Sequence, residues 1–141
     1  MAKSDQGHRG APIVVDGSNI AYLETTSNGK PTVRAVERVR ERLKQMGYRP
    51  IIIVDAALWH QVDDPDRLNA LIDKGVILQA PAGTDADVFV LETARREHTK
   101  IVTDDRYRDH ADRYPRPEEL RSPVMIVDGL VEFYDLQPAG K

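Results

Sequence analysis

An apolar run ends abruptly in acids at Ile101-Val102-Thr103-Asp104-Asp105-Arg106-Tyr107-Arg108-Asp109. A buried strand that ends in carboxylates is how a parallel sheet presents acids at its carboxyl edge, where open α/β folds bind their ligands. Two further segments carry acids at an element boundary: an apolar strand that ends at Asp16, and the head of a helix that carries Asp85 and Asp87. We therefore expect a site where acids from three separated segments meet.

Short apolar segments alternate with helical patterns along the chain. We predict strands at residues 12–16, 51–54, 76–78 and 100–103, and helices at residues 33–46, 65–74, 84–98 and 106–114. A C-terminal hairpin is predicted at residues 124–134, because Asp128-Gly129 between two apolar runs suits a two-residue turn. This order predicts an α/β fold, a three-layer α/β/α sandwich around a mainly parallel sheet.

The composition bounds the class of protein. The 141 residues, 40% of them hydrophobic, predict one compact domain at residues 12–136 between a disordered leader, residues 1–11, and a tail, residues 137–141. The absence of cysteine excludes disulfides and thiolate zinc sites. A net charge of −3 argues against bulk attraction to nucleic acid, although 20 Lys and Arg can form local basic surfaces. No segment resembles a signal peptide or a membrane span, so we expect a cytoplasmic protein without a membrane partner.

Each acid also has a structural explanation. Asp16 could be a turn residue, Thr84 and Asp87 resemble a capping box, and Asp104 or Asp105 could cap the following helix. Their expected convergence favours a site, because two carboxylates about 5 Å apart repel by roughly 3 kcal/mol at an effective dielectric near 20. Converging acids therefore indicate a bound cation, and oxygen ligands suit Mg²⁺ or Mn²⁺. Such a cation can activate water for phosphodiester hydrolysis.

Other polar residues near these acids have open roles. Asn19 follows Asp16 by three residues and could bind a phosphate oxygen or a metal-bound water, or be a turn residue. Asp109 follows Asp105 by four residues, one helical turn, so the two side chains can share a face. Ser18 is interpreted as a helix cap. The four histidines show no metal-ligand spacing, and we interpret them as solvated or structural.

Three motifs together resemble the NYN nuclease domain of the PIN-like superfamily, in its Regnase-like (Zc3h12a-type) branch. They are Val15-Asp16-Gly17-Ser18-Asn19-Ile20-Ala21, the pair Asp85 and Asp87, and the segment from Thr103 to Asp109. The resemblance covers about residues 12–134. It implies a PIN-like, Rossmann-like sheet with a central first strand, and a Mg²⁺-dependent endoribonuclease that acts on single-stranded RNA. By matching position it assigns metal binding to Asp16, Asp87, Asp105 and Asp109, and a catalytic role beside them to Asn19.

The sequence departs from the family pattern at two positions. Ala86 separates Asp85 from Asp87 where the branch tends to have adjacent acids, so either one can be the metal ligand. Asp104 stands where the branch usually has Asn, which adds a negative charge. Eukaryotic members also select RNA with a Cys/His zinc finger, which a chain without cysteine cannot form.

We expect basic residues around the acids to bind the RNA backbone. The candidates are Arg106 and Arg108 beside the acids, and Lys30, Arg34 and Arg38 on one helical face. One alternative is a catalytically silent PIN-like module that binds RNA or a protein, which the retained acids argue against. Another is a different Mg²⁺ enzyme, such as a phosphatase or a phosphoacceptor domain, in which Asp16 or Asp55 would be the phosphorylated nucleophile. The lack of a D-x-D at the end of the first strand argues against a haloacid-dehalogenase-like phosphatase. A homo-oligomer stays open as a further partner prediction.

Overall fold

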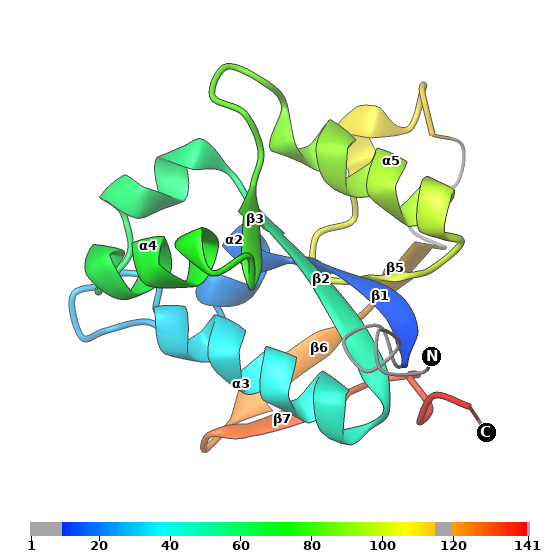
Figure 1. Cartoon of the computed structure of the whole chain (residues 1–141), viewed down its shortest axis with the longest axis horizontal. Helices are drawn as coiled ribbons and strands as arrows, with labels where there is room; N and C mark the ends of the chain where they lie inside the picture. The colour runs from blue at the N-terminus through cyan, green and yellow to red at the C-terminus, as the bar shows by residue number, and fades with distance from the viewer. Residues whose placement is uncertain (1–9, 115–119, 141) are drawn as a thin grey trace.

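The computed structural model describes residues 10–114 and 120–140. Its main sheet is parallel throughout and has the strand order β3-β2-β1-β4-β5 (Figure 1). The strands are β1 (Ala11–Asp16), β2 (Tyr48–Val54), β3 (Ile77–Gln79), β4 (Ile101–Val102) and β5 (Arg121–Ser122). The predicted α/β fold and the central position of the first strand are confirmed.

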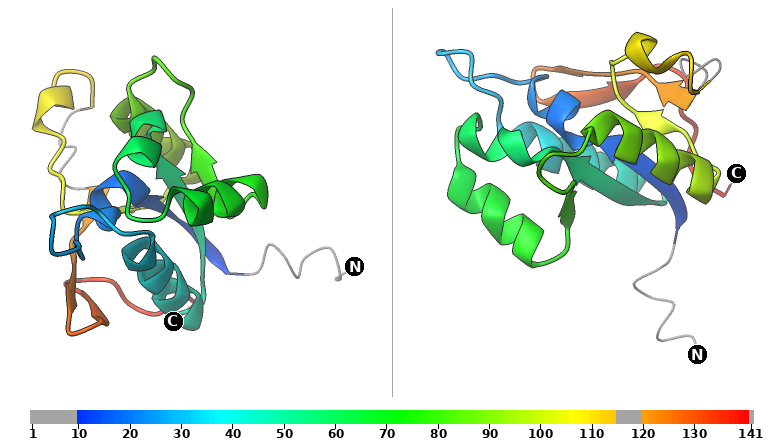
Figure 2. Two further views of the ribbon diagram at one scale, coloured as in Figure 1. Left: turned by 90° about the vertical axis from the view of Figure 1, so that its left-hand side faces the viewer. Right: turned by 90° about the horizontal axis from the view of Figure 1, so that it is seen from above.

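Helices cover both faces of this sheet. Helices α3 (Val33–Gln45) and α4 (Pro65–Asp73) lie on one side, and α5 (Ala86–Glu97) lies on the other (Figures 1 and 2). Alternate residues of β1 serve the two layers: Ile13 and Val15 join the apolar cluster of α3 and α4, whereas Val14 joins that of α5. Apolar residues fill the strand because a parallel sheet is buried on both faces.

The helix ends follow local signals in the sequence. Thr32 caps α3 by accepting a hydrogen bond from the N–H of Ala35, and the chain turns at Gly47, which has φ 92°. Asp64 caps α4 and Pro65 is its first residue, an arrangement that suits the fixed φ of proline. The predictions of these two helices are confirmed.

A hairpin lies beside the main sheet. Strands β6 (Val124–Val127) and β7 (Leu130–Phe133) pair antiparallel, and Asp128 and Gly129 between them have φ 51° and 78°. Positive φ at both positions is what a two-residue turn of this kind requires. Val124 is buried in the cluster of α3, so the hairpin covers that side of the core. The predicted C-terminal hairpin is confirmed.

The helix predicted at residues 106–114 is wrong. Only a 3₁₀ turn, η3 (Arg108–His110), forms there, and Tyr107 before it has a left-handed backbone with φ 54°. The physical reason is that Asp105 accepts a hydrogen bond from the N–H of Tyr107, a local turn that competes with helix formation. Tyr107 and Tyr114 instead turn inward and are buried.

Some predicted segments fall outside the described residues. These are most of the expected leader, residues 1–9, and the loop at Pro115 and Pro117. Strand β5 had no counterpart among the predicted strands. Within residues 10–114 and 120–140, no helix is both long and apolar enough to cross a membrane.

Candidate active site

The site lies at the carboxyl edge of the sheet, between β1 and β4. The strand order runs from β1 through β2 to β3 on one side and through β4 to β5 on the other, so the edge between β1 and β4 is a topological switch point. Strand β1 ends at Asp16, and Asp105 follows β4 by three residues. Helix α5 starts above the same edge and carries Asp87 in its first turn.

Three acids meet at this edge. Asp16, Asp87 and Asp105 each offer a carboxylate oxygen, and these oxygens lie within 4.8 Å of one another. Asp16 is buried, with 5% of its surface exposed, whereas Asp87 and Asp105 are half-buried. Three of the four acids expected to bind a metal are therefore close enough to share one ion.

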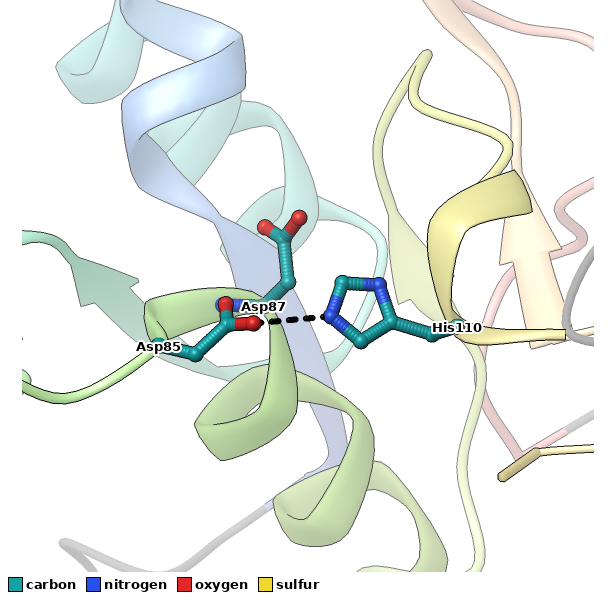
Figure 3. Close-up of side chains that lie close together, drawn as sticks. All are labelled: Asp85, Asp87 and His110. Carbon is teal, nitrogen blue, oxygen red and sulfur yellow. Dashed lines mark hydrogen bonds and ion pairs between the residues drawn. The ribbon is translucent and has the colours of Figure 1, made fainter. Parts of the chain in front are cut away.

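Asp85 lies on the other side of Asp87. It forms a second group with Asp87 and His110, in which Nε2 of His110 is 2.9 Å from Oδ2 of Asp85 (Figure 3). Oδ1 of Asp85 accepts the N–H of Asp87 and caps α5, so the predicted capping box from Thr84 to Asp87 is wrong. Asp87, whose side chain does not cap the helix, is the acid of this pair that groups with Asp16 and Asp105.

Asp109 is not in either acidic group of the described residues. The helical turn that was expected to align it with Asp105 does not form, because η3 begins only at Arg108. Asp109 instead lines an adjacent hollow of about 350 Å³. The other lining residues are Asp87, Asp104, Asp105, Arg106, Tyr107, Arg108 and His110. Its role as a metal ligand stays a prediction.

Asn19 connects the segment after β1 to the loop after β4. Its Oδ1 accepts a hydrogen bond of 2.9 Å from the N–H of Asp104, which ties the short helix α2 (Gly17–Ala21) to the loop after β4. Asp16, not Ser18, caps α2, and the hydroxyl of Ser18 accepts the N–H of Asp55 at 2.9 Å. The prediction of Ser18 as a cap is therefore wrong, while the roles of Asn19 toward phosphate or water stay a prediction.

Two of the predicted RNA contacts lie beside the acids. Arg106 and Arg108 are exposed and line the same hollow as Asp105. Arg34 and Arg38 lie one turn apart on α3.

Lys30 and Arg38 are placed differently from the prediction. Lys30 precedes α3, which begins at Val33, so the predicted common helical face of three residues is wrong. Nε of Arg38 pairs with Glu24 at 2.8 Å, and its Nη1 donates to the carbonyl oxygen of Gly129. Contacts of these residues to RNA stay predictions.

The sequence matches a family model that fits this arrangement. The match is to the Zc3h12a-like ribonuclease NYN domain and covers residues 9–125. The chain belongs to this family. No curated protein sequence matches it significantly.

Two solved structures share the fold of this NYN domain. Both are of PRORP2 from Arabidopsis thaliana, named nuclear protein-only RNase P 2 and nuclear proteinaceous RNase P 2. They are 21% identical to the NYN domain, with TM-scores of 0.67 and 0.69, and each match covers 90% of this chain but 30% of the PRORP2 chain. The present chain thus spans about a third of the PRORP2 length. The likeness shows the fold alone at this identity.

Burial and neighbouring negative charge raise the pKa of two acids of the NYN domain. Burial, then the charges of Asp16, Asp105 and Asp85, raise the pKa of Asp87 from 3.8 to about 6. Burial also raises the pKa of Asp16, against the opposing effect of the Tyr107 hydroxyl that hydrogen-bonds to it. The charges of Asp16 and Asp105 thus add to burial in raising the pKa of Asp87, against a smaller opposing effect of His110.

Asp85 has the opposite perturbation. A hydrogen bond with His110 is the main cause that lowers the pKa of the Asp85 carboxyl. A carboxylate already paired with an imidazole is less available to a metal ion, whereas at Asp87 burial and the neighbouring acids outweigh the effect of His110 on the pKa. The pKa shifts therefore agree with the geometry that places Asp87 in the central group.

Sequence reasoning missed three residues of the site: Thr103, Tyr107 and His110. Thr103 and Tyr107 both hydrogen-bond to Asp16, and both are buried. A large aromatic residue in an otherwise polar segment is the one signal that could have indicated a buried role for Tyr107. His110 approaches Asp85 only because the chain after β4 folds back toward α5, and no spacing in the sequence shows this.

Proposed function

We propose that this NYN domain is a Mg²⁺-dependent endoribonuclease that hydrolyses phosphodiester bonds of single-stranded RNA. The observation that carries the proposal is the meeting of Asp16, Asp87 and Asp105 at the switch point of the sheet. Membership in a family of ribonuclease domains supports RNA as the substrate.

The donor set fits a hard divalent cation. All three central ligands are carboxylates, and Mg²⁺ and Mn²⁺ prefer oxygen ligands. The ligands come from β1, α5 and the loop after β4, so the fold itself fixes their spacing. In the absence of a cation the same carboxylates repel one another, as the raised pKa of Asp87 indicates. We propose Asp16, Asp87 and Asp105 as the residues that hold the ion. Asp85 is paired with His110, and Asp109, which lines the adjacent hollow, stays a predicted further ligand.

A cation bound there would lower the pKa of an attacking water and offset negative charge on the scissile phosphate. Arg106 and Arg108 stand exposed beside the acids and would bind flanking phosphates of the RNA strand. Asn19 fixes the loop that carries Asp105, because it accepts the N–H of Asp104. In this proposal the acids hold the ion, the two arginines bind the RNA backbone, and Asn19 holds the loop with Asp105 in place.

Cleavage of a labelled single-stranded RNA tests the proposal. Wild-type protein should cleave it in Mg²⁺ and not in EDTA, and Asp16→Asn or Asp105→Asn should lower the rate by about 100-fold or more, because loss of a metal ligand costs at least as much as loss of its supporting contacts. Asp66→Asn, a charge change on the exposed surface of α4, is the matched control and should cleave normally.

The outcomes separate the two functional hypotheses. Cleavage that survives EDTA and both site variants would overturn the metal mechanism. RNA binding without any cleavage by the wild type would instead favour the catalytically silent binding module.

A further inference from the structure

Tyr107 is buried directly beneath the acidic site. Only 1% of its surface is exposed, and its hydroxyl donates a hydrogen bond of 2.7 Å to Oδ2 of Asp16. Its backbone is left-handed, with φ 54°, a conformation that is an outlier for a bulky side chain. Residues held in such conformations cluster at functional sites, where the surrounding structure compensates for the strain.

Tyr107 and three other residues form a closed ring of hydrogen bonds. The hydroxyl of Thr103 donates to Oδ2 of Asp16 at 3.3 Å and accepts the N–H of Asp105 at 3.0 Å. Oδ1 of Asp105 accepts the N–H of Tyr107 at 2.8 Å, and the hydroxyl of Tyr107 returns to Asp16. The ring therefore joins Asp16, on β1, to Asp105, in the loop after β4.

This ring engages one particular oxygen of each of the two acids. Oδ2 of Asp16 receives two hydrogen bonds from inside the protein, and Oδ1 of Asp105 receives one. Oδ1 of Asp16, which accepts only the N–H of Asn19 at 3.3 Å, and Oδ2 of Asp105 are the oxygens left to meet an ion. Partners that orient metal-binding carboxylates in this way commonly change metal affinity by about 10- to 100-fold when they are removed.

We propose that Tyr107 is a positioning residue that holds Asp16 and Asp105 in the geometry that binds the divalent cation. The inference rests on the proposed metal-dependent function and deepens it. Tyr107 acts through both of its polar groups: the hydroxyl orients Asp16, and the backbone N–H orients Asp105. The left-handed backbone of Tyr107 allows both contacts, because its ring points inward to Asp16 while its N–H faces the Asp105 carboxylate.

Tyr114 is the matched control that distinguishes a positioning role of Tyr107 from a purely structural one. Both tyrosines are buried in the apolar cluster that packs β1 against α5. The hydroxyl of Tyr114 donates to Glu92 on α5, not to an acid of the site. Tyr107→Phe and Tyr114→Phe each remove one hydroxyl from the same cluster, so a difference between them reports on the acids.

Mn²⁺ binding, followed by the electron paramagnetic resonance signal of the free ion, is the readout. Wild type and Tyr114→Phe should bind Mn²⁺ with equal Kd, whereas Tyr107→Phe should bind it about 10-fold more weakly. Equal Kd for Tyr107→Phe and wild type, or equal weakening in both variants, overturns the positioning role. Failure of the wild type to bind Mn²⁺ overturns the metal proposal itself, which distinguishes the two.

A second pair of variants decides the matter if Tyr107→Phe does not fold. Thr103→Val removes the hydroxyl that joins Asp16 to Asp105, and Thr103→Ser keeps it. Thr103→Val should weaken Mn²⁺ binding by about 10-fold, and Thr103→Ser should restore the wild-type Kd. Equal binding by the two variants contradicts the ring of hydrogen bonds as a positioning device.

Discussion

Replacing Asp87 by Asn should stabilise the metal-free protein. Burial and the charges of Asp16, Asp105 and Asp85 raise the pKa of Asp87 from 3.8 to about 6. At 1.36 kcal/mol for each tenfold change in proton affinity, this rise corresponds to about 3 kcal/mol of destabilisation at pH 7. Water screens a half-buried group, so we take about 1.5 kcal/mol as the free energy of unfolding regained by Asp87→Asn.

Loss of the favourable interaction with the dipole of α5 lowers the stability of Asp87→Asn by a smaller amount. Asp87 is the second residue of α5, where a negative charge interacts favourably with the helix dipole, and its loss costs about 0.5 kcal/mol. The net gain is therefore about 1 kcal/mol, or about 3 °C in Tm for a domain of this size. Asp66 has the matching place, second in α4 after an aspartate cap, but it is exposed and belongs to neither acidic group of the described residues. Asp66→Asn should lose only the dipole contribution and melt slightly below wild type.

The gain should depend on pH in a definite direction. Because the pKa of Asp87 is higher in the folded than in the unfolded state, the folded protein loses stability as the pH rises from about 4 to about 6. Asp87→Asn should therefore melt above wild type at pH 7 in EDTA, and the difference should vanish near pH 4. Thermal denaturation at the two pH values measures it. A Tm at or below that of wild type at pH 7, or a gain that does not change with pH, would refute the electrostatic reasoning.

Three further predictions concern the ion, the RNA and the backbone. Mg²⁺ at about ten times its Kd should raise the Tm of wild type by about 4 °C, and no shift at millimolar Mg²⁺ would contradict the proposed site. Arg106→Ala with Arg108→Ala should weaken RNA binding and lower the slope of log affinity against log salt by about 1.4, whereas Arg42→Ala in the last turn of α3 should leave both unchanged. Gly17→Ala should cost about 1–3 kcal/mol in chemical denaturation, because its Cβ would lie 2.7 Å from Cγ1 of Val54 and 3.0 Å from the carbonyl oxygen of Ile53; an unchanged midpoint would show that the sheet edge adjusts.

The central strands could be predicted because their environment leaves a strong pattern. Strands β1 and β2 are buried on both faces, so their sequences are continuous apolar runs such as Ile51 to Val54. Strand β5 is only Arg121 and Ser122, and its pairing with β4 leaves no pattern in the sequence. The strength of the signal thus follows how deeply a strand is buried.

The helix at residues 106–114 was predicted wrongly for a related reason. Tyr107, Ala111 and Tyr114 have helical spacing, but the two tyrosines reach the core from a backbone that turns instead of coiling. Spacing shows which residues are apolar and not the path by which they are buried. The wrongly predicted helix is the reason why Asp109 is expected to share a helical face with Asp105.

The meeting of the acids could be predicted from the sheet alone. Asp16 ends β1 and Asp105 follows β4 by three residues, and these neighbouring parallel strands end at the same edge of the sheet. Whether Asp85 or Asp87 faces them depends on which one caps α5, a local competition that the sequence left open. The contact of His110 with Asp85 depends on the fold of the segment after β4, which has no local signature.

Cleavage of a circular single-stranded RNA tests most directly whether the converging acids form an endonuclease. A circle has no end, so only internal hydrolysis can open it. In Mg²⁺ the wild-type protein should convert the circle to a linear product, and Asp105→Asn at equal concentration should leave it closed. A circle that stays intact with the wild type, or that Asp105→Asn opens at the same rate, would contradict the proposed active site.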